Sequence, residues 1–177
     1  MFGDVCHDVE CEPHLQSLSG EQIHPNSANL NDDARTDIRA RGFWRRGQCA
    51  FFDARVFHPN AQSYRSSKIE TLYRRHENLK KREYGDRIRE VENGSFTPLV
   101  FATTGGLSRE TTIFYKRLAE LMSISRNAKY HETISWMRRK LSFSLVKSAI
   151  MCIRGSRSIK ANYNDNITLG LTESHPV

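Results

Sequence analysis

The chain has 177 residues, of which 38% are hydrophobic, and its formal net charge is +7 at pH 7. This size suffices for one domain with a buried core, and no internal repeat is evident. The longest apolar runs are too short to span a bilayer, and no secretory-signal pattern is visible. Four irregularly spaced cysteines do not form a disulfide framework, so we expect an intracellular protein without a membrane partner. The positive charge favours a polyanionic partner such as nucleic acid.

The first 33 residues are polar and weakly patterned. Residues 20–33 are rich in Asn, Asp, Ser and Pro, which predicts a loop. Cys6, His7, Cys11 and His14 lie close together in the sequence. Their spacing is loose and no second ligand pair follows, so ordinary residues are favoured over a zinc site.

A β-hairpin is predicted next. Apolar and polar residues alternate from 36 to 41, residues 42–47 supply a turn, and residues 50–57 alternate again. A hairpin centred near Arg45 places Asp37 directly opposite Asp53. Two like charges in such a cross-strand pair destabilise the sheet unless something positive lies between them. The pattern therefore indicates a metal ion or a basic side chain at this point.

The rest of the chain predicts helices around one more strand. A long amphipathic helix is expected over 66–92, a buried strand over 96–102, and helices over 108–125 and 128–152. The last helix either forms a dimer face or, more simply, is buried as a second layer. This order predicts an α/β or α+β fold with a small mixed sheet, in a single domain over 1–156 with a flexible polar tail over 157–177.

Asp37 and Asp53 are spaced for metal-assisted hydrolysis of a phosphodiester bond. Mg²⁺ takes oxygen ligands, neutralises phosphate charge and lowers the pKa of a bound water. Arg55 lies two residues after Asp53 on the same strand face, where it can contact the scissile phosphate. On spacing alone, a surface ion pair of Asp53 with Arg39 or Arg41 is the commoner arrangement.

Two further residue types are interpreted as structural. His24, His58 and His76 have no partner at a defined spacing, so we assign them to the surface or the core. Trp44 stands beside Arg45 and could stack on a base. A tryptophan in this setting more often closes one end of a sheet, and we favour that interpretation.

Seven short phrases carry a resemblance to known proteins. They are DDARTD at 32–37, RGFW at 41–44, FFDARV at 51–56, FTPLVF at 96–101, GG at 105–106, KLSF at 140–143 and RGSR at 154–157. Over nearly the whole chain, these phrases resemble a group of animal proteins linked to retroelement reverse transcriptases. The order of Asp37, Asp53 and Arg55, followed by a basic helix and a strand, resembles the PD-(D/E)XK, or restriction-endonuclease-like, nuclease superfamily.

The resemblance implies an α-β-β-β-α-β core with its first strand within residues 9–18. Asp37 and Asp53 would be the metal ligands, and Arg55 stands where the superfamily usually has lysine. A guanidinium cannot be deprotonated as a base, so Lys80 or Lys81 would serve as a migrated catalytic lysine. A solvated helix lysine is the simpler alternative. Only residues 1–8 remain for the opening helix, which suggests an N-terminally truncated copy.

The function implied is a Mg²⁺-dependent endonuclease that acts on DNA rather than RNA, and in that case in the nucleus. The residues expected to contact nucleic acid are Arg39, Arg41, Arg45, Arg46 and Lys81. The alternative is a catalytically inactive nucleic-acid-binding module with the same fold. A third possibility is an interaction domain whose charge has no nucleic-acid partner.

Overall fold

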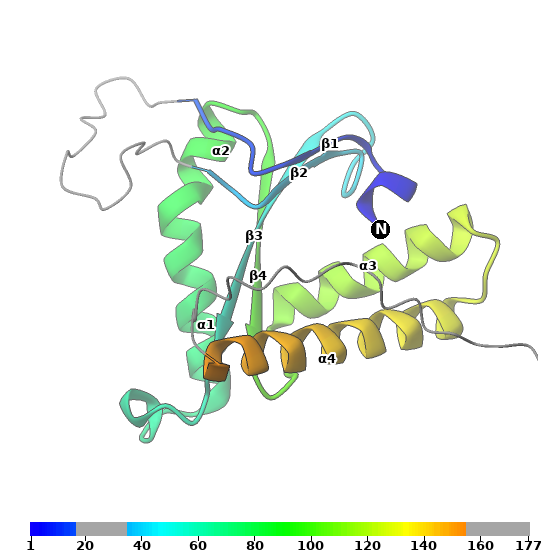
Figure 1. Cartoon of the computed structure of the whole chain (residues 1–177). Coiled ribbons are helices and arrows are strands. Elements are labelled where there is room, and N and C mark those ends of the chain that lie inside the picture. The colour runs from blue at the N-terminus through cyan, green and yellow to red at the C-terminus, as the bar shows by residue number, and fades with distance from the viewer. Residues whose placement is uncertain (17–34, 155–177) are drawn as a thin grey trace, which may run out of the picture.

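The computed structural model describes residues 1–16 and 35–154. The loop expected over 20–33, His24 and the tail expected over 157–177 lie outside these residues. The elements are β1 (His7–Cys11), β2 (Ile38–Arg41), β3 (Cys49–Phe57), α1 (Ile69–Lys80), α2 (Asp86–Glu90), β4 (Ser95–Ala102), α3 (Arg109–Ser125) and α4 (Tyr130–Arg154) (Figure 1).

The four strands form one mixed sheet in the order β1-β2-β3-β4. β1, β2 and β3 pair antiparallel, and β3 pairs parallel with β4. Ile38 lies opposite Phe52 and Arg41 opposite Cys49. This is the register of a hairpin centred near residue 45, and it confirms the predicted pairing.

The first strand is shorter than the range 9–18 expected from the resemblance. β1 begins at His7 and ends at Cys11. Glu12 then adopts a left-handed backbone conformation with a φ of 52°, and Pro13 cannot donate to a strand ladder. The segment before β1 holds only a short 3-10 turn at Phe2–Asp4.

Helices cover both faces of the sheet (Figure 1). On one face, α3 and the start of α4 enclose a core in which the rings of Phe2, Phe43, Phe52 and Phe114 are in mutual contact. On the other face, α1 and α2 pack on β3 and β4 through two smaller clusters. The fold is therefore mixed α+β, with a four-stranded sheet between helical layers.

The helix predicted over 66–92 is interrupted. A π-helical turn at Lys81–Gly85 separates α1 from α2. Along a straight α-helix, residues spaced four apart rotate gradually around the helix axis. A wider π turn compensates for this rotation and returns the later residues to the same face. Leu72 at one end and Ile88 at the other can therefore both be buried against the sheet. The turn lies where α1 passes Asp53, so it also shapes the candidate site.

The favoured prediction of a buried second layer holds for the first part of the last helix and not for the rest. Met137 in the first part of α4 is buried, and Ile134 and Leu141 pack against the same core. Beyond Leu141, the side chain of Phe143 is 76% exposed and that of Val146 is 58% exposed. The first half of α4 packs on α3, and the second half extends beyond α3. No helix within the described ranges combines the length and apolarity that a membrane crossing requires.

Candidate functional site

Asp37 and Asp53 meet where β2 begins and β3 passes beside it. The β2–β3 register, continued by one residue, places these two aspartates opposite each other. The Oδ2 atom of Asp37 accepts a hydrogen bond from the backbone N–H of Ala54 at 2.6 Å. Asp37 is exposed, whereas the side chain of Asp53 is only 8% exposed. One carboxylate therefore faces solvent while its cross-strand neighbour lies under α1.

Lys80, in the last turn of α1, supplies the positive charge that the two aspartates require. Its Nζ atom lies 2.9 Å from Asp53 Oδ2 and 3.3 Å from Glu83 Oε2, and its side chain is 15% exposed. At 2.9 Å, Lys80 is the charged partner of the buried Asp53 Oδ2 atom. The sequence pattern allowed a metal ion or a basic side chain here, and a basic side chain is present.

The surface ion pair considered from spacing alone does not form. Arg39 pairs with Glu10 at 3.2 Å, and Arg41 pairs with Asp8 at 3.1 Å. Both acids lie on β1, the edge strand that pairs with β2, where Glu10 is directly opposite Arg39. Asp53 is instead covered by α1, which no local spacing could indicate.

The charges around Asp53 influence one another. Burial raises the pKa of Asp53, Lys80 opposes that shift, and the negative charges of Asp37 and Glu83 add to it. Burial alone would lower the pKa of Lys80, but Asp53 and Glu83 outweigh it, so the net pKa is raised. The pKa of Tyr84 is raised by burial, by its hydrogen bond with Glu83 and by the nearby aspartates. The result is one coupled cluster of Asp37, Asp53, Lys80, Glu83 and Tyr84.

Glu83 and Tyr84 could not be identified from the sequence as members of this cluster. Both lie in the π-helical turn, and the Lys80 ammonium sits 5.1 Å from the centre of the Tyr84 ring. Their only sequence signal is a position three and four residues after Lys80, on the same side of a helix. That signal becomes useful only once Lys80 is known to face the sheet.

No protein-family model, curated protein or solved structure matches the chain. The assignment of a function therefore depends on the geometry of this cluster.

Arg55 lies further along β3, two residues beyond Asp53. It forms no ion pair with Asp37 or Asp53 among the interactions of the described residues, and Lys80 holds that position instead. Its charge acts on His76 of α1, whose pKa is lowered first by burial and then by Arg55 and Arg75. His76 is buried, and its ring lies 4.6 Å from that of Phe57 at a tilt of 40°. Its Nε2 atom lies 3.3 Å from the Tyr64 hydroxyl.

The buried His76 should make stability depend on pH. Its folded pKa lies below the ordinary 6.5, so only the unfolded chain gains this proton as the pH falls through about 6.5. We therefore expect the free energy of unfolding to be greater at pH 7.5 than at pH 5.5. Urea titrations of wild-type and His76→Gln proteins at both pH values should show a smaller difference in the variant. The exposed His131→Gln change should leave the difference as in wild-type, and an equal difference in all three proteins would contradict this role.

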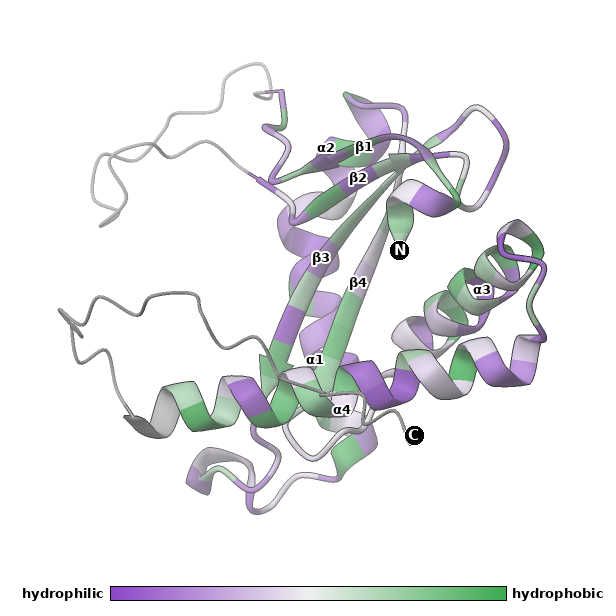
Figure 2. Ribbon diagram, turned by 45° about the vertical axis from the view of Figure 1, so that its right-hand side comes forward, coloured by the Kyte–Doolittle hydropathy of each residue, from purple (hydrophilic) through white to green (hydrophobic). Residues whose placement is uncertain are grey.

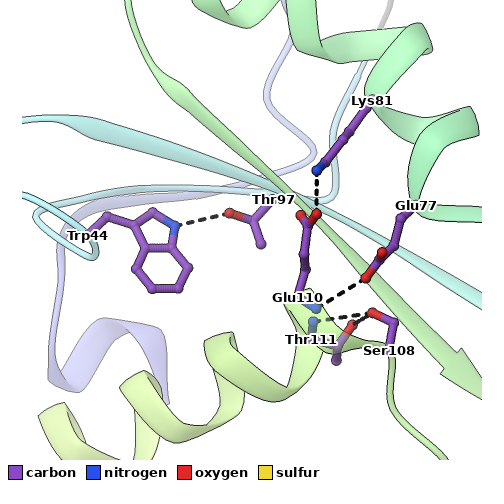
Figure 3. Close-up of polar contacts among 7 residues, drawn as sticks. All are labelled: Trp44, Glu77, Lys81, Thr97, Ser108, Glu110 and Thr111. Atoms are coloured by element: carbon purple, nitrogen blue, oxygen red, sulfur yellow. Dashed lines mark hydrogen bonds and ion pairs between the residues drawn. The ribbon is translucent and has the colours of Figure 1, made fainter. Parts of the chain in front are cut away.

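The basic residues expected to contact nucleic acid have different environments. Arg39, Arg41 and Lys81 are already paired with acids, and Lys81 binds Glu110 at the start of α3 (Figure 3). Arg45 and Arg46 lie exposed in the β2–β3 turn and make no ion pair with any residue that the structure describes. Of the five expected contacts, these two are the most available to a phosphate backbone.

Trp44, in the β2–β3 turn, is partly buried against the core. Its indole N–H donates to Thr97 Oγ1 at 3.0 Å (Figure 3). Its ring meets that of Phe43 edge-on at 4.7 Å. Glu77, also shown in Figure 3, accepts a hydrogen bond from the backbone N–H of Glu110 at 3.1 Å. The first of these hydrogen bonds joins the β2–β3 turn to β4, and the second joins α1 to the start of α3.

Two carboxylates are enough to bind a hard divalent cation such as Mg²⁺, although these two do not surround a metal site by themselves. Within the described ranges, no three His, Cys, Asp or Glu side chains are grouped to hold a metal. Mg²⁺ in phosphate-processing sites is commonly bound by one or two carboxylates, with water and substrate oxygens completing its shell. Asp37 and Asp53 match that requirement in number, and Lys80 Nζ lies 2.9 Å from the Asp53 Oδ2 atom.

Proposed function

We propose that the chain is a metal-dependent phosphodiester hydrolase of the restriction-endonuclease-like type, acting on DNA. The observation that carries this proposal is that Asp37, just before β2, and Lys80, in α1, both lie beside Asp53 of β3. The two carboxylates would hold Mg²⁺, which when bound activates water and neutralises phosphate charge. The order of three strands, a helix and a strand is also the order that the superfamily core has after its opening helix.

Lys80 takes the place of the usual strand lysine. Because Asp53 and Glu83 raise its pKa, its side chain remains an ammonium at neutral pH. It therefore orients water or a phosphate oxygen and stabilises negative charge, and it does not act as a base. Arg55, on the same face of β3, is the second group able to contact the phosphate, through the fork of its guanidinium.

The Asp37→Asn substitution tests this function. An asparagine oxygen can still accept the hydrogen bond from Ala54, so the fold should persist while one anionic ligand is lost. We expect Mg²⁺-dependent nicking of supercoiled plasmid DNA to fall by about 100-fold, which corresponds to about 2.7 kcal/mol of transition-state stabilisation. The matched control is Asp8→Asn, which removes an exposed carboxylate on β1 and should nick like wild-type. Equal nicking by wild-type and Asp37→Asn proteins would refute the proposal.

A non-catalytic nucleic-acid-binding module is the second candidate. The observation that favours it is the Asp53–Lys80 ion pair, which balances the buried carboxylate without a metal. Under this alternative the wild-type chain binds DNA with an affinity that falls steeply with salt, and it cleaves none with Mg²⁺ present. The same plasmid assay, read alongside a binding titration at two salt concentrations, separates the two functions.

A further inference from the structure

The second half of α4 presents an apolar surface that nothing in the described structure covers. Phe143 and Val146 are mostly exposed, and Met151 is 63% exposed. Figure 2 shows this end of the helix continuing beyond α3, with hydrophobic and hydrophilic residues interleaved along it. Large exposed apolar side chains gathered on one element are typical of a surface that binds a partner.

The apolar and basic residues of α4 follow a regular spacing. Trp136, Phe143 and Ile150 recur every seven residues, and Lys140 and Lys147 recur at the same interval between them. Steps of four and three residues place all five on one side of a helix. Four of the five line one surface hollow, whose lining residues are Trp136, Arg139, Lys140, Phe143, Ser144 and Lys147. We refer to Trp136, Lys140, Phe143, Lys147 and Ile150 as the α4 seam.

The charge along the seam has a single sign. Between Trp136 and Ile150 the helix carries Arg138, Arg139, Lys140 and Lys147 and no acidic residue. Lys140 is held 5.2 Å from the centre of the Trp136 ring, which fixes a positive charge beside the apolar seam. A complementary ligand must therefore offer apolar groups seven residues apart with carboxylates between them.

We propose that the α4 seam docks an acidic amphipathic helix of a partner protein. Its leucine-like side chains would cover Phe143 and Ile150, and its carboxylates would pair with Lys140 and Lys147. This inference goes beyond hydrolysis at Asp37 and Asp53, because the seam belongs to the helical layer on the opposite face of the sheet.

Other occupants match the seam less well. A phosphate backbone would satisfy the lysines but leave the aliphatic side chains of Val146, Ile150 and Met151 in water. A second copy of α4 would bring lysines toward lysines without an acid to pair them. Only a ligand that is both acidic and apolar satisfies both kinds of side chain.

Two synthetic helical peptides test the proposal on the full chain. Both have 21 residues, with leucine at the positions that would face the seam. One peptide carries glutamates next to these leucines and the other carries lysines. Binding of each peptide is measured by fluorescence anisotropy in about 0.15 M salt. We expect the glutamate peptide to bind and the lysine peptide not to bind. The Lys140→Glu/Lys147→Glu protein should bind the glutamate peptide at least about tenfold more weakly and gain affinity for the lysine peptide. Lys68→Glu/Lys116→Glu, with the same charge change on other elements, should behave as wild-type.

Several results would overturn this inference. One is failure of the glutamate peptide to bind, and another is unchanged affinity in the Lys140→Glu/Lys147→Glu protein while circular dichroism shows it folded. Binding confined to phosphatidylserine vesicles or to a single-stranded oligonucleotide would replace the helical partner with a membrane or a nucleic acid. A wild-type dimer that Phe143→Asp dissociates, observed by sedimentation, would assign the seam to a second copy of this chain.

Discussion

Replacing Phe52 by alanine should lower the free energy of unfolding by about 4 kcal/mol. Phe52 is completely buried, and its ring lies 5.1 Å from the rings of Phe43 and Phe114 and 5.2 Å from that of Phe2. Removing the ring deletes its transfer free energy and leaves a cavity that three neighbouring rings cannot readily fill. Urea denaturation measures the loss.

Val56→Ala is the matched control for this core substitution. Val56 lies on the same strand but is 54% exposed, so truncating it should cost less than about 0.5 kcal/mol. Similar losses in the two variants would mean that β3 is not buried against α3 at Phe52.

Replacing Lys80 by methionine should lower the free energy of unfolding by about 3 kcal/mol. Methionine keeps most of the side-chain volume but leaves the Asp53 carboxylate buried beside Asp37 and Glu83 without a positive partner. A buried charge without its partner costs far more than the pair itself contributes, and this accounts for the size of the effect.

A second substitution and a neighbouring lysine make this experiment specific. Asp53→Asn in the Lys80→Met background removes the uncompensated charge, so much of the lost stability should return. Lys81→Met removes a more exposed ion pair with Glu110 and should cost less than about 1 kcal/mol. If Lys80→Met and Lys81→Met lowered the free energy of unfolding by the same small amount, the Asp53 carboxylate would not depend on Lys80 for a compensating charge.

The hairpin could be predicted because its determinants are local. Alternation of apolar residues fixes which side of each strand faces the core. A shift of the pairing register by one residue would move every side chain to the opposite face of the sheet. Gly42 and Gly47, with φ angles of 89° and 80°, allow the turn that sets this register. Asp37 and Asp53 were therefore placed opposite each other by local pattern alone.

The partner of Asp53 could not be predicted in the same way. Lys80 reaches it only because α1 lies across β3, and the π-helical turn that follows sets the positions of Glu83 and Tyr84. These are tertiary effects, and a helical lysine looks the same in sequence whether it faces solvent or a buried carboxylate. The sequence left α4 undecided between a dimer face and burial for a similar reason, because apolar spacing shows which residues share a side but not what covers that side.

The most direct measurement of the candidate site compares plasmid nicking by four proteins with Mg²⁺ present. They are wild-type, Asp53→Asn, Lys80→Met and the double variant, assayed at a temperature where circular dichroism shows each to be folded. Residues that act as one catalytic unit are strongly non-additive. We expect each single variant to lose about 100-fold in rate and the double variant to lose no more. Absence of nicking by the wild-type chain, or full activity in Lys80→Met, would contradict a hydrolytic site built from Asp37, Asp53 and Lys80.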